Sequence, residues 1–200
     1  MTTTTQKKTT TKQKTIEVKR EEDVENLPNN PFIFEILNLV SKMRTKEKKI
    51  QMLKKYEHDS LKSVLIWNFD ESIISMLPPG EVPYAATSEQ NTFSGTLSSK
   101  IEDAVSKMGE LGSNSLGSQD QGRSSIRKEY QNFYNFVKGG NDGLSSLRRE
   151  TMFINILQGL HPLEAEILCL VKDKKLSEKY KITKEIVSEA YPDISWGGRS

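Results

Sequence analysis

The side chains best able to do chemistry are few in this sequence and are spread widely. The chain has two histidines, His58 and His161, and one cysteine, Cys169. In a helix, His161 and Cys169 would lie about two turns apart, so the helix alone would not bring them into contact. Glu164 and Glu166 would fall on different helix faces and form no acid/base pair. We therefore expect no catalysis, no metal ion and no cofactor.

A glycine-rich loop, GGNDG at residues 139–143, could hold a phosphate, because backbone N–H groups before a helix bind anions. Its spacing is not that of the GxxxxGK[ST] nucleotide-binding loop, and no strand is expected before it. Gly139 and Gly140 also fit the end of one helix and the turn into the next. We expect that structural role, with phosphate binding as the lesser alternative.

Lysines form the strongest charged cluster. The chain is nearly neutral overall, with 29 basic and 27 acidic residues, but positive charge is concentrated in residues 42–55. Such a helix could lie along a phosphate backbone, although a solvated helix face explains the same residues. The hypothetical nucleic-acid-binding residues are Lys46, Lys48, Lys49, Lys54, Lys55, Arg148 and Arg149.

A second feature connected with nucleic acids lies near the end of the chain. Residues 176–190 fit a degenerate helix-turn-helix, with a turn at Lys181 and Ile182 and a second helix capped by Thr183. The fit is imperfect, because Lys181 stands where glycine is usual and Ser177 replaces a small apolar residue. A simple terminal helix is the favoured alternative.

The elements that must position these residues are helices. Apolar side chains recur at intervals of three and four residues in most of the chain, which predicts an all-α fold. The densest pattern, residues 144–175, predicts two helices. The first has Leu147, Ile154 and Leu157 on its apolar stripe and ends at Gly159, and the second begins at Pro162. Trp67 is expected in the core. The other helices are predicted from Pro31, capped by Asn30, to residue 44, at residues 46–57 (capped by Thr45), from Asp59 or Ser60 to residue 69, and at residues 71–77 (capped by Asp70) and 124–138.

Composition divides the chain into regions. Residues 1–30 are rich in threonine and lysine and then in acidic residues, which predicts a disordered arm. Residues 31–84 and 125–192 are predicted to form a single helical domain. The LPPGEVPY segment at residues 77–84 is expected to pack across the helices, with binding of a partner as polyproline as the lesser alternative. Residues 85–124 are predicted to be a flexible Ser/Gly-rich insertion holding one amphipathic helix at residues 97–111. Residues 193–200 are expected to form a tail.

The same composition bounds the cellular setting. A single cysteine excludes an internal disulfide, which fits a reducing compartment. No apolar run is long enough to span a membrane, and the N-terminal residues lack the apolar core of a signal peptide. We expect a soluble, non-exported protein with no membrane partner.

Three segments together resemble a known group of proteins. They are LPPGEVPY, the long run from Phe136 to Leu176, and ITKEIVSEAYP at residues 182–192. The combination is similar to an uncharacterised family of small proteins in T4-like tailed phages, especially those of marine cyanobacteria. The resemblance spans residues 31–84 and 130–192, and it implies a phage origin and the host cytoplasm without implying an activity.

Two functions remain after these observations. The first is a non-enzymatic phage accessory protein that acts as a protein-interaction adaptor through exposed apolar surface, with a phage or host protein as partner. The alternative is a nucleic-acid-binding protein that uses the basic helix 42–55 and the helix-turn-helix at 176–190. Salt should separate them, because phosphate contacts weaken steeply as salt rises and apolar contacts do not.

Overall fold

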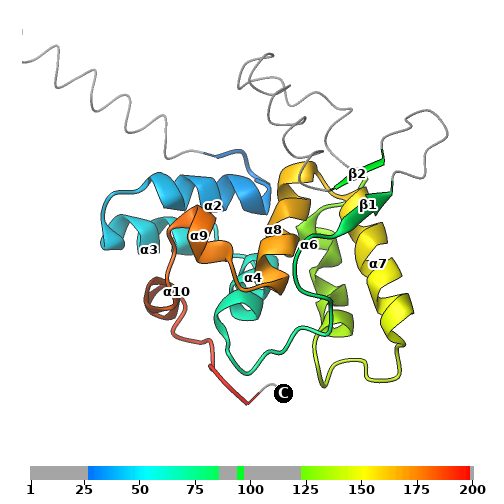
Figure 1. Ribbon diagram of the computed structural model, residues 1–200. Helices are drawn as coiled ribbons and strands as arrows, with labels where there is room; N and C mark the ends of the chain where they lie inside the picture. The colour runs from blue at the N-terminus through cyan, green and yellow to red at the C-terminus, as the bar shows by residue number, and fades with distance from the viewer. Residues whose placement is uncertain (1–26, 86–93, 97–122, 199–200) are drawn as a thin grey trace, which may run out of the picture. The chain divides into compact units, whose positions relative to one another are not determined.

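A computed structural model of the chain describes residues 27–85, 94–96 and 123–198. The chain divides into two units, residues 1–31 and Phe32–Ser200, and the description below concerns the second. The predicted all-α class is confirmed (Figure 1). Its helices are α2 (Ile33–Lys42), α3 (Lys46–Lys55), α4 (Asp59–Phe69), α6 (Ile126–Glu129), the 3-10 helix η1 (Tyr130–Phe136), α7 (Ser146–Gly159), α8 (Pro162–Lys172), α9 (Leu176–Tyr180) and α10 (Lys184–Ala190).

A short two-stranded ribbon accompanies these helices. Strand β1 (Pro83–Ala85) pairs antiparallel with β2 (Ser94–Thr96), with Tyr84 opposite Gly95. The ribbon stands where the Ser/Gly-rich insertion was predicted to begin. The amphipathic helix predicted at residues 97–111, and the predicted arm up to residue 26, lie outside the described residues. The proposed division into domain, insertion and tail stays a prediction.

Helices α8 and α4 form the centre of the second unit. Helix α8 contacts α2, α4, α7 and α9, and α3 lies between α2 and α10. Helix α2 begins two residues later than predicted, at Ile33 and not at Pro31, because Phe32 is the N-cap residue and its N–H donates to Glu35 Oε2 at 2.8 Å. Six of the ten residues of α2 are then buried, so this helix is held mainly by packing.

An aromatic cluster joins α4, η1 and α7. The ring of Trp67 lies 5.1 Å from that of Phe133 and stacks on Phe136, and Phe136 meets Phe153 edge to face at 5.2 Å. Trp67 is 2% exposed, so its predicted place in the core is confirmed. Offset and edge-to-face aromatic pairs add to the stabilisation that burial provides.

Two predicted helices are wrong. Residues 124–138 form the single turn of α6 followed by the 3-10 helix η1, and residues 71–77 are not helical. The second segment instead pairs with the first through a bridge between Ser75 and Val137. Met76 N donates to Phe136 O at 2.8 Å and Lys138 N donates to Ile74 O at 2.9 Å. These long-range bonds replace the local bonds that a continuous helix would have made.

Asp70 does not cap a helix as predicted. It follows the last residue of α4, and its carboxylate accepts hydrogen bonds from the backbone and hydroxyl of Ser72. The same carboxylate accepts from Gly197 N at 3.0 Å, so it also fixes the backbone at Gly197 next to the end of α4. A buried aspartate with distant donors cannot be distinguished from a helix cap by its sequence neighbours alone.

Gly140 explains the tight connection between η1 and α7. A Cβ atom at this position would lie 1.9 Å from the carbonyl oxygen of Tyr134, which only glycine avoids. The loop at residues 139–143 is therefore the turn that its glycines predicted. Within the described ranges, none of the helices is long and apolar enough to cross a membrane.

Candidate interaction surfaces

Part of the positive charge of the basic helix α3 is paired with acidic side chains of α10. Thr45 caps α3 by accepting from Lys48 N, as its sequence position predicted. Lys46 Nζ lies 2.5 Å from carboxylate oxygens of both Glu185 and Glu189, which raise the pKa of this lysine. Lys49 Nζ donates to the carbonyl of Lys181 at 2.7 Å. Of the lysines proposed to bind phosphate, Lys46 therefore holds α10 against α3, and Lys49 holds the turn that precedes α10.

The remaining lysines of α3 are distributed unevenly. Lys54 and Lys55 are exposed in the last turn, and Lys48 is half-buried. Lys55 Nζ also lies 5.3 Å from the centre of the Tyr56 ring, a cation–π distance. The positive surface of this helix is consequently smaller than the sequence indicated.

The predicted helix-turn-helix has the expected boundaries. Helix α9 ends at Lys181, whose φ of 47° is left-handed, and Thr183 Oγ1 accepts from Ile186 N at the start of α10. The buried side of α10 faces α3, with Ile186 and Val187 covered. Its exposed side carries Glu185 and Glu189, which would repel phosphate if α10 entered a groove.

The two arginines of α7 have different environments. Arg148 is exposed, whereas Arg149 is 2% exposed. Arg149 Nε donates to Asn135 O at 2.7 Å, and a terminal nitrogen donates to Asn141 O at 2.8 Å. Arg149 thus fastens the glycine-rich loop to α7. Its guanidinium is turned to these carbonyls and away from the surface that a phosphate would reach.

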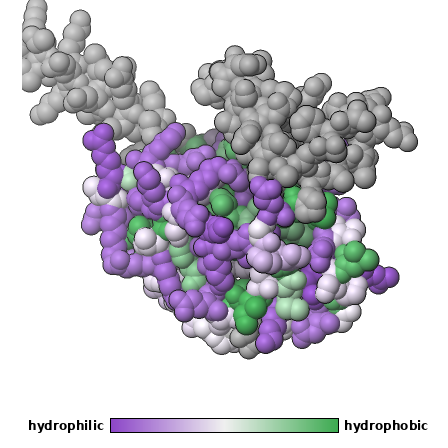
Figure 2. Space-filling model, in the orientation of Figure 1, coloured by the Kyte–Doolittle hydropathy of each residue, from purple (hydrophilic) through white to green (hydrophobic). Residues whose placement is uncertain are grey.

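An apolar groove runs along the exposed side of α7. It has a volume of about 690 Å³, and its apolar side chains include Leu144, Leu147, Met152 and Ile156. Leu147 is 77% exposed, although its spacing predicted a place on the buried stripe of this helix. Figure 2 shows a small hydrophobic area over α7 on the face of the molecule that it presents. Exposed apolar surface gathered in a groove is typical of an interaction site.

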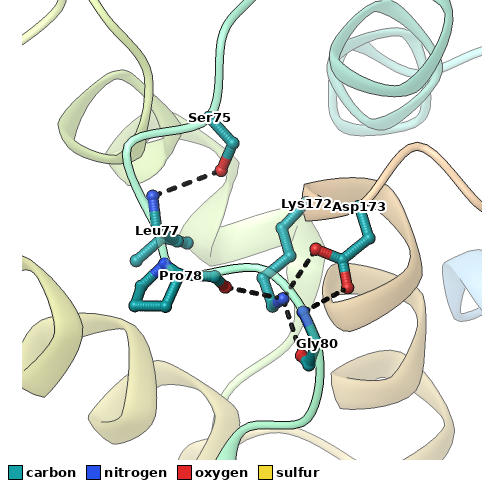
Figure 3. Close-up of polar contacts among 6 residues, drawn as sticks. All are labelled: Ser75, Leu77, Pro78, Gly80, Lys172 and Asp173. Atoms are coloured by element: carbon teal, nitrogen blue, oxygen red, sulfur yellow. Dashed lines mark hydrogen bonds and ion pairs between the residues drawn. The ribbon is translucent and has the colours of Figure 1, made fainter.

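A buried lysine organises the proline-rich segment. Lys172 Nζ donates to Pro78 O at 2.9 Å, to Gly80 O at 2.8 Å and to Asp173 Oδ1 at 2.8 Å (Figure 3). Asp173 Oδ2 accepts in turn from Gly80 N at 3.1 Å. The predicted packing of this segment across the helices is confirmed. The clamping role of Lys172 was missed, because a lysine in the last turn of a helix also suits the helix dipole.

Glu164 is a second buried charged residue that the sequence did not single out for this role. Its Oε1 accepts from Ile33 N at 3.0 Å and its Oε2 from Ile126 N at 2.9 Å, so one carboxylate joins the starts of α2 and α6 to α8. Burial raises its pKa, while the two backbone N–H groups and the charge of Arg127 oppose that shift. Such a side chain is best explained as a structural cross-link.

The residues considered for catalysis have separate environments in the structure. His161 is the N-cap of α8, where its Nδ1 accepts from Leu163 N at 3.1 Å and its ring stacks on Phe34. Burial raises the pKa of the Cys169 thiol to about 12, which disfavours the thiolate. Among the described residues, no group of three His, Cys, Asp or Glu side chains could hold a metal ion.

Comparison with known proteins gives one match. The model of a family of unknown function, DUF6433, matches residues 36–110 and 112–178. The chain belongs to DUF6433. The expectation of an uncharacterised family is confirmed, and the match carries no activity. No curated protein and no solved structure matches the chain significantly.

The region matched by the DUF6433 model contains some of these surfaces and leaves out others. It includes the α7 groove, Lys172 and Glu164, and it ends within α9 before α10 begins. The second half of the helix-turn-helix and its carboxylates therefore lie outside the matched region. The groove along α7 lies inside it.

Proposed function

We propose that this DUF6433 protein is a non-enzymatic phage accessory protein that acts in the host cytoplasm as a protein-interaction adaptor. The observation that supports this proposal is the groove along α7, where Leu147 is 77% exposed. Solvent exposure of a leucine inside an apolar groove gives no stability to the free chain. It becomes favourable when a partner covers the groove.

The groove favours an amphipathic helix as the bound element. Helix α7 has 14 residues, so the groove beside it is about 20 Å long, which suits three or four turns of a second helix. Apolar anchors would lie against Leu144, Leu147 and Ile156. Arg148 lines the same groove and is exposed, so an acidic residue on the partner would face it.

The test compares capture of proteins by matched variants. Tagged full-length chain is incubated with nuclease-treated lysate of phage-infected cells, and bound proteins are quantified. We expect one defined protein to be retained by the wild type and reduced about fivefold or more by Leu147→Ser, the usual effect of losing an anchor. A helical peptide from that protein should then bind the purified chain directly and be weakened equally by Leu147→Ser.

The matched control is Ile74→Ser. Ile74 is an exposed aliphatic residue outside the α7 groove, so this variant removes similar apolar surface elsewhere. Equal loss of the captured protein with both variants would contradict a specific role for the groove. Retention by Leu147→Ser of all proteins bound by the wild type would do the same.

Nucleic-acid binding is the second candidate, and the exposed Lys54 and Lys55 near Lys48 favour it. The probe is a double-stranded DNA of mixed sequence. Three phosphate contacts would weaken binding about 40-fold between about 50 and 200 mM salt. Replacement of these three lysines by Gln should remove that dependence, while Leu147→Ser should not. Absence of DNA binding at the lower salt concentration would exclude this candidate.

A further inference from the structure

The two ends of the α7 groove differ in shape. At the start of α7, Leu147 is 77% exposed and projects beside the exposed Arg148. At the other end lies Gly159, the last residue of α7, which has no side chain to fill the groove. Leu147 and Gly159 are separated by about 18 Å along the helix axis. The groove therefore has a projecting apolar side chain at one end and room for one at the other.

The two ends also differ in charge, because Glu129 lies near Gly159. Ser124 N donates to Gly159 O at 2.8 Å, and Ser124 Oγ donates to Glu129 Oε1 at 2.6 Å, so this carboxylate is close to the end of α7. Arg148 lies about 16 Å from Gly159 along the axis. Both charged side chains line the groove, and the ion pairs found among the described residues include neither of them. Opposite charges thus stand at opposite ends.

A groove with these ends is complementary to a second copy of itself. If two copies met across a twofold axis near Met152, their α7 helices would run antiparallel, and each contact would occur twice. Leu147 of each copy would lie over Gly159 of the other, where no side chain blocks it. Arg148 of each copy would lie at the end that holds Glu129 of the other, so opposite charges would meet. A parallel arrangement would instead bring the two Arg148 side chains together.

We propose that the α7 groove binds a second copy of this chain, with the two α7 helices antiparallel. Helix α7 has 14 residues and matches in length the groove that it lines, so each copy would both offer a helix and receive one. The proposal rests on the proposed function, since both assign binding to this groove. It adds regulation, because a partner helix would reach the groove only by displacing the second copy.

The dimer should be weak enough for a partner to displace it. Stable interfaces bury about 800 Å² on each side, and one groove about 20 Å long and about 10 Å wide offers less than that. We expect a dissociation constant of roughly 10–100 μM. At about 1 μM, a concentration suited to denaturant titrations, the chain would be monomeric and its groove free.

The test is sedimentation velocity of the purified full-length chain at concentrations from about 1 to 500 μM. We expect a monomer at the lowest concentration and a dimer that increases with concentration. Leu147→Ser should weaken the dimer about tenfold, whereas Ile74→Ser, which removes exposed apolar surface outside the groove, should leave it unchanged. Absence of a dimer at the highest concentration would overturn the proposal, and so would a dimer that Leu147→Ser does not weaken.

Exchange of the two charges tests the antiparallel pairing. Arg148→Glu and Glu129→Arg, each checked for folding by circular dichroism, should each weaken the dimer about fivefold or more, because either change alone brings like charges together. An equimolar mixture of the two variants should regain the wild-type affinity. In the mixed dimer the introduced glutamate meets the introduced arginine, and the native arginine meets the native glutamate. A mixture that associates no more strongly than either variant alone would overturn the proposal.

Capture of proteins from lysate separates this proposal from the proposed function. A chain that stays monomeric and still retains a different protein through Leu147 would overturn self-association and support the adaptor role. A dimer that depends on Leu147 and Arg148, with no different protein captured, would support self-association and contradict the adaptor role. The two proposals can therefore fail separately.

Discussion

At the scale of single residues, two of the buried charged side chains explain more of the structure than any exposed one. Glu164 and Lys172 are both on α8, and each satisfies backbone groups of segments that are distant in sequence. Buried charged groups persist only when their hydrogen bonds are made. These two side chains consequently fix the positions of α2, α6 and the proline-rich segment on α8.

The raised pKa of Glu164 predicts a pH dependence of stability. Because its folded-state pKa lies above the ordinary 4.5, the folded chain retains a proton that the unfolded chain has released. Stability should therefore fall as pH rises from about 4.5 to the folded-state pKa, by about 1.4 kcal/mol for each pH unit of that window. Above it the effect should be constant.

The measurement is the free energy of unfolding from denaturant titrations at several pH values, for the wild type and Glu164→Gln. Glutamine cannot ionise, so the difference between the two chains isolates this carboxyl group from all other titrating groups. Relative to the variant, the wild type should lose stability as pH rises through the window. A difference independent of pH would show that the two chains do not differ by a shifted carboxyl group.

Lys172 offers a prediction at neutral pH. Lys172→Met keeps the aliphatic stem but leaves Asp173 and the carbonyls of Pro78 and Gly80 without the ammonium, so we expect a loss of about 2–4 kcal/mol in unfolding free energy. Lys175→Met is the matched control, because Lys175 is exposed, and it should change stability by less than about 0.5 kcal/mol. Equal effects of the two variants in denaturant titrations would refute the clamp.

At the scale of elements, the junction between α9 and α10 carries local strain. Lys181 and Lys174 are the non-glycine residues with positive φ in the described ranges, and Lys181 has a φ of 47°. Lys181→Gly should relieve this conformation and raise the unfolding free energy by about 0.5–1 kcal/mol. The bond from Lys49 goes to the backbone carbonyl of residue 181, so the substitution retains it.

The control for Lys181→Gly is a glycine substitution inside α9, the helix that comes directly before Lys181. Glu178 is exposed within α9, and Glu178→Gly should lower the unfolding free energy by about 0.5–1 kcal/mol, the ordinary cost of glycine in a helix. Thermal and denaturant unfolding of both variants give the comparison. If both substitutions destabilise the chain, the left-handed lysine imposes no strain.

Local sequence signals predicted most elements and failed where distant contacts decide. The cap at Thr45, the proline at the start of α8, the boundaries of α9 and α10 and the burial of Trp67 all follow from neighbouring residues. The segment after Asp70 has helical spacing, yet it pairs with residues 136–138, sixty or more residues away. Its partner is not encoded in the local pattern.

For the interaction surfaces, too, local spacing was informative and contacts with distant segments were not predictable. Lysine spacing located α3, but it could not show that Lys46 binds α10 and that Lys49 binds the turn before it, because Glu185 and the carbonyl of Lys181 come from another part of the chain. Apolar spacing placed Leu147 on a helix and assigned it to the wrong face. The stripe of α7 is wide enough to suit two faces, and only the position of α8 decides which one is buried.

At the scale of the whole molecule, exposed apolar residues should be dispensable for folding. Leu147 and Tyr134 lie in different pockets and are both exposed. We expect Leu147→Ser and Tyr134→Ala each to change the unfolding free energy by less than about 0.5 kcal/mol, and the double variant to show the sum of the two changes. Denaturant titrations of the three variants beside the wild type provide the measurement.

A large loss of stability with Leu147→Ser would contradict the free groove. A loss of more than about 1.5 kcal/mol with Leu147→Ser would mean that this leucine is already covered in the free chain, because an exposed side chain contributes little to stability. The α7 groove would then be part of the fold and could not receive a partner without displacing its cover. Near-neutral effects on stability, together with the loss of partner binding by Leu147→Ser, would instead separate function from folding in this protein.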